Sequence, residues 1–158
     1  MIDEDKVRQQ GSADGVTHYS TGIAAVRDGK ILLVRRAAGD HLGGVYELPG
    51  GGVEENEVIQ TAAVRELREE TGLDTAKILG VFAGFDYSTP NKPKVRQANF
   101  LVEVKEGDVK LLPDEHDKYV WVSSALELDD LDVTGPMRTC VIDALNKLST
   151  FKTRVKLD

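Results

Sequence analysis

The sequence has very little cysteine and no long apolar run. Cys140 is the only cysteine among 158 residues, which excludes an internal disulfide and a zinc site built from several cysteines. We expect Cys140 to be buried. No stretch approaches the roughly 18 apolar residues of a membrane span, and the first twenty residues lack the apolar run of a secretion signal. We therefore expect a cytoplasmic protein with no membrane partner.

Positive charge is also in short supply. The chain has 20 lysines and arginines against 27 aspartates and glutamates, which gives a formal net charge of −7. Non-specific binding to nucleic acid needs a basic surface, so we expect no nucleic-acid partner. An acidic protein can still bind a small anionic ligand where metal ions or a few arginines reverse the local charge.

Internal repeats and low-complexity segments are absent from the sequence as well. The length and the 41% hydrophobic content suit a single domain with one sizeable core. We expect a polar N-terminal arm over residues 1–16, either loose or forming an edge element. The folded domain should cover residues 17–150, and a basic tail should follow over residues 151–158.

Apolar runs separated by turn residues predict several strands and two helices. The Asp28-Gly29 pair is typical of a β-hairpin turn. Strands joined by hairpin-length connections favour a mixed or mostly antiparallel sheet in a layered α/β or α+β domain. The predicted strands cover residues 17–26, 31–36, a short stretch from 45, 76–87, 95–104 and 119–123, and the predicted helices cover residues 57–71 and 136–148.

The ends of the predicted helices and the loops follow from turn residues. Gly72 suits a left-handed stop for the first helix, and Pro136 suits the start of the second. A helical turn and a loop are expected over residues 124–134. The predicted loops cover residues 37–44, 88–94 and 108–118, the last with a brief strand at 109–112.

Three carboxylates share one face of the first predicted helix. Glu66, Glu69 and Glu70 are spaced i, i+3, i+4 in the run RELREETG, and like charges at this spacing repel by a few tenths of a kcal/mol per pair. One alternative is a plain solvated surface, on which Arg65 and Glu69 form an ion pair worth about 0.3–0.5 kcal/mol.

Two neighbouring features favour a metal site over the solvated surface. Ile59, Ala62 and Ala63 continue the carboxylate stripe, so the stripe should pack against the sheet and be partly shielded from water. Three glycines from Gly50 precede the helix and let the backbone approach a ligand closely. An unpaired buried charge is costly, and carboxylate oxygens suit Mg²⁺ or Mn²⁺, which are often shared with substrate phosphates. We therefore predict a divalent metal site.

The residues around this helix also resemble a known motif. Gly51, Glu57, Arg65, Glu66, Glu69, Glu70 and Gly72, with the apolar Leu67 and Leu73, match the signature box of the Nudix hydrolase family, which includes the MutT-like nucleotide pyrophosphohydrolases. The matched box covers about a seventh of the chain. The resemblance implies an α/β/α sandwich around a mixed sheet. It also implies hydrolysis of a nucleoside diphosphate linked to another moiety, with Mg²⁺ or Mn²⁺ as cofactor.

The resemblance assigns roles to the box residues. Glu66, Glu69 and Glu70 would bind metal. Alternatively one of them, often the residue at the position of Glu66, would act as general base instead, and because family members differ on this the base is left open. Arg65 would orient a box carboxylate, with a simple surface ion pair as the alternative. Glu57 would support the site, and the carbonyl of Gly50 would be a further metal ligand.

A later loop should supply another acidic ligand if the resemblance holds. Glu115 is the first choice and Glu103 the second, and the alternative for Glu115 is a solvated loop residue. His116 either contacts substrate or is a bystander. His18 and His41 have no metal-ligand spacing.

Residues outside the box should bind the substrate. Arg35 and Arg36 end a predicted strand near the glycine loop, and strand alternation lets at most one of them face the site. Tyr119 would stack on a base, because DEHDKYVW resembles the same region of some dinucleoside polyphosphate hydrolases. Tyr46 and Phe85 are interpreted as packing residues. A second basic patch, either phosphate-binding or merely solubilising, consists of Lys92, Lys94 and Arg96.

Several functional alternatives stay open. The substrate, a small nucleotide, would be a nucleoside triphosphate, an ADP-ribose-like sugar diphosphate or a dinucleoside polyphosphate. A non-catalytic, nucleotide-sensing Nudix-fold domain is the alternative function, although such domains usually lose box carboxylates. Isopentenyl diphosphate isomerases of the family are longer and carry a cysteine-glutamate site, whereas Cys140 lies in the last predicted helix. Nudix proteins are often dimers, so a homodimer is one expected assembly.

Overall fold

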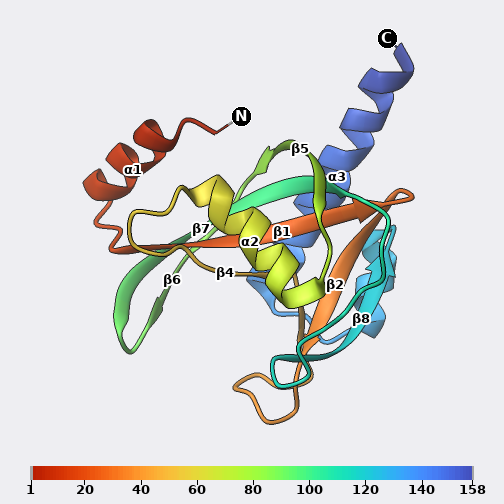
Figure 1. Cartoon of the computed structure of the whole chain (residues 1–158), viewed down its shortest axis with the longest axis horizontal. Coiled ribbons are helices and arrows are strands. Elements are labelled where there is room, and N and C mark those ends of the chain that lie inside the picture. The colour runs from red at the N-terminus through yellow and green to blue at the C-terminus, as the bar shows by residue number, and fades with distance from the viewer. Residues whose placement is uncertain (1, 158) are drawn as a thin grey trace.

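The computed structural model describes residues 2–157, which form a mixed sheet covered by helices on both faces (Figure 1). Helix α2 (Ile59–Thr71) lies on one face and helix α3 (Gly135–Leu157) on the other. A third helix, α1 (Glu4–Ala13), lies beside the loop that leads into α2. The predicted sandwich around a mixed sheet is confirmed.

The central strand β1 (His18–Arg27) organises the sheet. It runs parallel to β7 (Lys92–Val104) along almost its whole length. On its other side, its C-terminal end pairs with β2 (Lys30–Arg36), and its N-terminal half pairs with β4 (Gly50–Gly52). The remaining strands are β3 (Tyr46–Glu47) and β8 (His116–Val122), both paired with β2, and β5 (Thr75–Phe82) and β6 (Asp86–Thr89), both paired with β7.

The core has two layers because successive strand residues point to opposite faces of the sheet. In β1, Ile23 and Ala25 pack toward α2, whereas Ala24 and Val26 pack toward α3. Cys140 belongs to the α3 layer and is buried, as predicted. Among the described residues, no helix is both long enough and apolar enough to cross a membrane.

Two predicted turn features are confirmed. Asp28 and Gly29 both have positive φ angles, 52° and 76°, as a two-residue hairpin turn between β1 and β2 requires. Gly72 has a φ of 73° and donates its amide to the carbonyl of Arg68, which ends α2.

The segments around the predicted loops differ from expectation. The sequence from 88 to 94 was predicted as a loop, but β6 and β7 continue into it and form a tight hairpin with Thr89 opposite Lys92. Pro90 and Asn91 alone supply the turn. Conversely, residues 109–112 form no strand, and β8 begins at His116 instead of residue 119.

Both chain ends also differ from the prediction. Residues 4–13 form helix α1, whose start is stabilised by Asp3, because its side chain accepts a hydrogen bond of 3.1 Å from the amide of Lys6. At the other end, α3 continues from the predicted end at 148 to Leu157.

Candidate active site

The glycine loop and helix α2 meet where β4 pairs with β1. The amide of Gly50 donates a hydrogen bond of 3.0 Å to Oε2 of Glu70. At Gly51, an added Cβ would lie 2.5 Å from the carboxyl carbon of Glu66, so only glycine lets the strand approach this carboxylate so closely. The close approach of backbone and carboxylates is as predicted.

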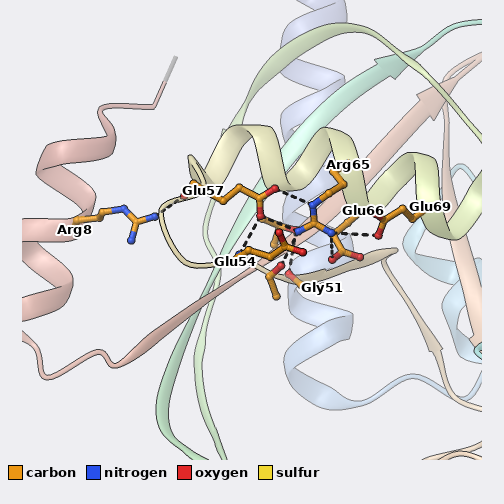
Figure 2. Close-up of polar contacts among 9 residues, drawn as sticks. Arg8, Gly51, Glu54, Glu57, Arg65, Glu66 and Glu69 are labelled. Atoms are coloured by element: carbon orange, nitrogen blue, oxygen red, sulfur yellow. Dashed lines mark hydrogen bonds and ion pairs between the residues drawn. The ribbon is translucent and has the colours of Figure 1, made fainter.

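Arg65 forms the centre of a hydrogen-bond network in front of α2 (Figure 2). Its Nε and Nη2 each donate to one oxygen of Glu57, at 2.8 Å in both cases. Its Nη1 donates to Glu66 at 2.8 Å and to Glu69 at 3.2 Å, and Nη2 also donates to the carbonyl of Gly52 at 3.0 Å. Arg65 is therefore more than a partner in a single surface ion pair, because it joins two carboxylates of the helix to the preceding loop.

The Glu57–Arg65 pair is fixed in its charged form. The hydrogen bonds from Arg65 lower the pKa of Glu57 to about 2, against the opposing effect of burial. The same hydrogen bonds raise the pKa of Arg65 further above its ordinary value. Arg65 thus stays positive and Glu57 negative over the whole physiological pH range, and both oxygens of Glu57 are occupied.

Two of the three box carboxylates are shielded from water and one is not. Glu70 is 7% exposed and the side chain of Glu66 is 14% exposed, as predicted. The prediction was wrong for Glu69, whose side chain is 54% exposed.

Burial changes the protonation of these two carboxyls. It raises the pKa of Glu70 to about 8; the Gly50 amide and the nearby His116 oppose the rise, whereas Glu66 and Glu47 add to it. Burial also raises the pKa of Glu66, although the hydrogen bond from Arg65 acts in the opposite direction. Both groups therefore favour a compensating positive charge, either a proton or a cation.

The loop before β8 brings two more candidate ligands to Glu70. One carboxylate oxygen each of Glu70 and Glu115 and one ring nitrogen of His116 lie within 4.8 Å of one another. Nδ1 of His116 is buried and has no hydrogen-bond partner among the described residues. The carboxylate oxygens of Glu70 and Glu115 suit Mg²⁺ or Mn²⁺, whereas an imidazole is a more usual ligand of softer divalent ions. The two carboxylates therefore fit the predicted metal ion.

The second choice for the late acidic ligand, Glu103, lies elsewhere. Glu103 pairs with Val26 near the C-terminal end of β1, whereas the glycine loop pairs with β1 around Gly22. Four strand residues separate the two positions by about 13 Å. The structure therefore places Glu115 beside the box and Glu103 away from it.

A cavity of about 270 Å³ is lined by Glu47, which lies 3.8 Å from Nε2 of His116, and by one of the two predicted arginines. Arg36 lines it and pairs with Glu47 at 2.9 Å. Arg35 instead pairs with Asp117 at 2.8 Å, so the two arginines diverge as strand alternation requires. The other lining residues are Leu42, Val45, Tyr46, Phe85, Tyr87, Gln97, Thr134 and Met137.

The structure also shows where the other predicted aromatic and basic residues lie. Tyr46 is 7% exposed and packs in the core, as predicted, with one edge on the cavity. Tyr119 is 43% exposed on β8, and its stacking role stays a prediction. In the second basic patch, Arg96 and Lys94 pair with Asp86, at 2.8 and 3.9 Å, and the choice between a phosphate-binding and a solubilising role stays a prediction.

The family of the chain follows from comparison with known proteins. The sequence profile described as NUDIX domain matches residues 16–137. The chain belongs to the Nudix family. The box of Glu66, Glu69 and Glu70 lies within the matched residues, whereas α1 and most of α3 lie outside them.

Three relatives show the range of this Nudix family. The 8-oxo-dGTP diphosphatase of Escherichia coli K12 is 35% identical over 89 residues, which make up 56% of this chain and 67% of that protein. The ADP-ribose pyrophosphatase of Methanocaldococcus jannaschii is 39% identical over 89 residues, 53% of this chain and 49% of that protein. The crystal structure of a MutT NUDIX hydrolase from Burkholderia pseudomallei is 29% identical, has a TM-score of 0.65, and covers 82% of this chain and 95% of its own.

The alignments with several curated relatives cover only part of those proteins. The chain spans about half the length of two further curated relatives that it matches, 54% and 42%. The comparisons therefore show the family and the fold of this chain.

The sequence analysis did not predict the positions of two residues near this Nudix site, Glu47 and His116. Glu47 was not singled out, yet it pairs with Arg36 and lies 3.8 Å from Nε2 of His116, which links the cavity to Glu70. His116 was treated as a loop residue, yet it is 5% exposed. Burial of His116 lowers its pKa, but the negative charges of Glu47, Glu70 and Glu115 outweigh this effect and raise it. The sequence feature that could have pointed to Glu47 is its position three residues before Gly50.

Proposed function

We propose that this chain hydrolyses a pyrophosphate bond in a nucleoside diphosphate linked to another group, with Mg²⁺ or Mn²⁺ as cofactor. The observation that carries the proposal is the convergence of Glu70, Glu115 and His116 within 4.8 Å, beside Glu66 and the backbone of Gly50. A buried carboxyl with a pKa of about 8 is unstable as a lone anion, and a divalent ion compensates it. In this proposal the metal ligands are Glu66, Glu69, Glu70, Glu115 and the carbonyl of Gly50.

The chemistry requires charge compensation and a positioned water. A bound divalent ion would neutralise phosphate oxygens and lower the pKa of a water molecule. Arg65 holds Oε1 of Glu66 at 2.8 Å, so the carboxylate keeps a fixed orientation while its other oxygen can accept a proton. Glu66 therefore meets the geometric requirement of a general base, which must be held within hydrogen-bond reach of its proton. In that role Glu66 would act instead of binding metal, and Glu69, Glu70, Glu115 and the carbonyl of Gly50 would hold the ion.

The cavity beside Glu47 is the proposed nucleotide site. Its aromatic walls, Phe85 and Tyr87, have ring centroids 5.8 Å apart, and Arg36 supplies positive charge at the side that faces Glu47. A volume of about 270 Å³ is at the lower end of ligand pockets. This size favours one nucleoside, as in a nucleoside triphosphate or an ADP-ribose-like compound, over a dinucleoside polyphosphate.

The names of the relatives agree with this substrate class. The Escherichia coli relative is named for 8-oxo-dGTP and the Methanocaldococcus relative for ADP-ribose, and both compounds contain a nucleoside diphosphate. A non-catalytic nucleotide sensor is the alternative. It is disfavoured because every carboxylate of the box is present and Arg65 is paired with two of them.

A substrate panel tests the proposal. Purified protein would be incubated with 8-oxo-dGTP, dGTP, ADP-ribose and a dinucleoside polyphosphate, in the presence of Mg²⁺ or Mn²⁺, and the products separated by anion-exchange chromatography. We expect hydrolysis of one of the first three to a nucleoside monophosphate, and loss of turnover in Glu70→Gln. Folded, metal-loaded protein that cleaves none of the four would contradict the proposal.

A further inference from the structure

Helix α1 lies before the residues that match the Nudix profile, yet it contacts the loop that carries Glu57 (Figure 2). Nη2 of Arg8 donates a hydrogen bond of 2.8 Å to the carbonyl of Glu57. The carboxylate of Glu4 accepts from the amide of Ile59, at 3.2 and 3.3 Å for its two oxygens. Glu4 and Arg8 also pair with each other at 2.8 Å. Two side chains of α1 thus contact the chain on both sides of Val58.

Helix α2 depends on this outside contact for its first turn. The first amides of a helix have no partner within the helix and are usually satisfied by a Ser, Thr, Asp or Asn side chain at the N-cap. The N-cap residue here is Val58, which makes no side-chain cap hydrogen bond. Glu4 supplies the missing acceptor to Ile59, and its negative charge suits the positive end of the helix dipole.

The loop before α2 has little packing of its own. Glu54 and Glu57 form a turn through two hydrogen bonds, of 3.1 and 3.0 Å, and Asn56 in the turn has a φ of 64°. A cavity of about 440 Å³ separates one side of this turn from the start of β1. The cavity is lined by Arg8, Thr17, His18, Tyr19, Val53, Glu54, Glu55 and Asn56. The position of Glu57 therefore depends on polar contacts more than on packing.

A continuous series of contacts leads from this loop to the box carboxylates. Glu57 uses both oxygens to bind Arg65, and Arg65 in turn binds Glu66 and Glu69. A shift of the Glu57 backbone would therefore move the guanidinium of Arg65 and, with it, Oε1 of Glu66.

We propose that Glu4 and Arg8 are positioning residues for the Nudix site, which act through Glu57 and Arg65 to fix the orientation of Glu66. Arg8 itself is held by the ring of Tyr19, whose centroid lies 5.1 Å from its guanidinium carbon. The catalytic part of this inference rests on the proposed function, since it requires Glu66 to act in hydrolysis or metal binding. The structural part, in which α1 orders Arg65, can be tested without turnover.

The test compares Glu4→Gln and Arg8→Ala with the matched control Asp5→Asn. Like Glu4→Gln, the control removes one negative charge from the first turn of α1, but Asp5 is exposed. The first measurement is the exchange of the Arg65 Nε proton with water by NMR, which reports its hydrogen bond to Glu57. We expect exchange to accelerate at least about fivefold in Glu4→Gln and Arg8→Ala and to stay unchanged in Asp5→Asn.

The second measurement addresses the site itself. Substitution of residues that support metal ligands typically lowers affinity or activity by about 10–100-fold, and Glu4 and Arg8 act one contact further away. We therefore expect the Kd for Mn²⁺ to rise about three- to tenfold in both variants. With 8-oxo-dGTP or ADP-ribose, whichever the wild type hydrolyses, kcat should fall by a similar factor while KM stays within about twofold. Arg8→Lys, which keeps a donor for the Glu57 carbonyl, should recover part of the loss.

A purely structural role for α1 gives a different pattern. If Glu4→Gln and Arg8→Ala lower Tm but leave Arg65 exchange, Mn²⁺ affinity and kcat unchanged, the inference is overturned. If no substrate is hydrolysed by the wild type, the proposed function fails, while the exchange and Mn²⁺ measurements still decide whether α1 orders Arg65 and Glu66.

Discussion

Metal binding to this site should be coupled to the release of a proton from Glu70. In metal-free protein, burial raises the pKa of Glu70 to about 8. At pH 7, a group with that pKa is about 90% protonated, so a cation that binds the carboxylate must displace about 0.9 proton. Burial also raises the pKa of Glu66, which acts in the same direction.

Because Mn²⁺ binding is coupled to proton release from Glu70, the affinity for Mn²⁺ should depend on pH. Below pH 8, each fall of one pH unit makes deprotonation of Glu70 about tenfold less favourable, which corresponds to about 1.4 kcal/mol. The Kd for Mn²⁺ should therefore rise about tenfold from pH 7 to pH 6, and it should become nearly independent of pH above about pH 9. A surface carboxylate with an ordinary pKa would give no such dependence between pH 6 and pH 8.

Isothermal titration calorimetry measures the released protons directly. Mn²⁺ would be titrated into metal-free protein at pH 7 in buffers with different ionisation enthalpies, and the slope of observed enthalpy against buffer enthalpy gives the proton number. Glu70→Gln, which cannot hold this proton, is the control. A proton number below about 0.2 for the wild type, or a Kd that is flat from pH 6 to pH 8, would refute the reasoning.

Three further predictions concern the same residues. Glu70→Gln should lower kcat by at least about 100-fold, because a neutral amide replaces the buried metal ligand, while far-UV circular dichroism stays unchanged; a near-normal kcat would count against the assignment. Glu57→Gln should lower the free energy of unfolding by about 1–2 kcal/mol at pH 7 in urea titrations, a value reduced for solvent screening. Because the pKa of Glu57 is depressed to about 2, its contribution is present above pH 4.5 and disappears as pH falls toward 2, so a deficit that persists at pH 2 would disagree. Chelation with EDTA should abolish hydrolysis and added Mg²⁺ or Mn²⁺ should restore it, whereas activity that survives chelation would exclude a metal-dependent reaction.

Local patterns were sufficient for the box helix and its C-terminal end. The spacing of Glu66 and Glu70 placed both on the face that packs near the glycine loop, and Gly72 ended the helix as a left-handed residue must. The Asp28-Gly29 turn was equally clear, because its conformation is a property of two neighbouring residues. The choice of Glu115 over Glu103 depended on family resemblance, and the structure places Glu115 at the site.

Structural features that depend on residues far apart in the sequence could not be predicted from local sequence patterns. Residues 1–16, predicted as an arm, contain helix α1, in which Glu4 and Arg8 contact residues more than 45 positions away. The local sequence pattern does not indicate contacts between residues so far apart. The hydrogen bonds of β6 likewise required β7 beside it before the proline-containing segment could be recognised as a hairpin.

Several expectations stay predictions. They include the cytoplasmic location, the homodimer, the absence of a nucleic-acid partner and the stacking role of Tyr119. Arg36 is placed at the cavity, but its contact with a phosphate also stays a prediction, because its present partners are Glu47 and Asp40.

The central claim is that the acidic face of α2 is occupied by divalent ions when the enzyme works. Anomalous diffraction from crystals soaked in Mn²⁺ tests it most directly, because the signal identifies the ion and its position together. The account predicts a manganese peak about 2.1 Å from an oxygen of Glu70, with Glu66 or Glu115 among the other ligands. Crystals that contain manganese elsewhere but show no peak at Glu70, with its carboxyl still bound to the amide of Gly50 alone, would contradict it.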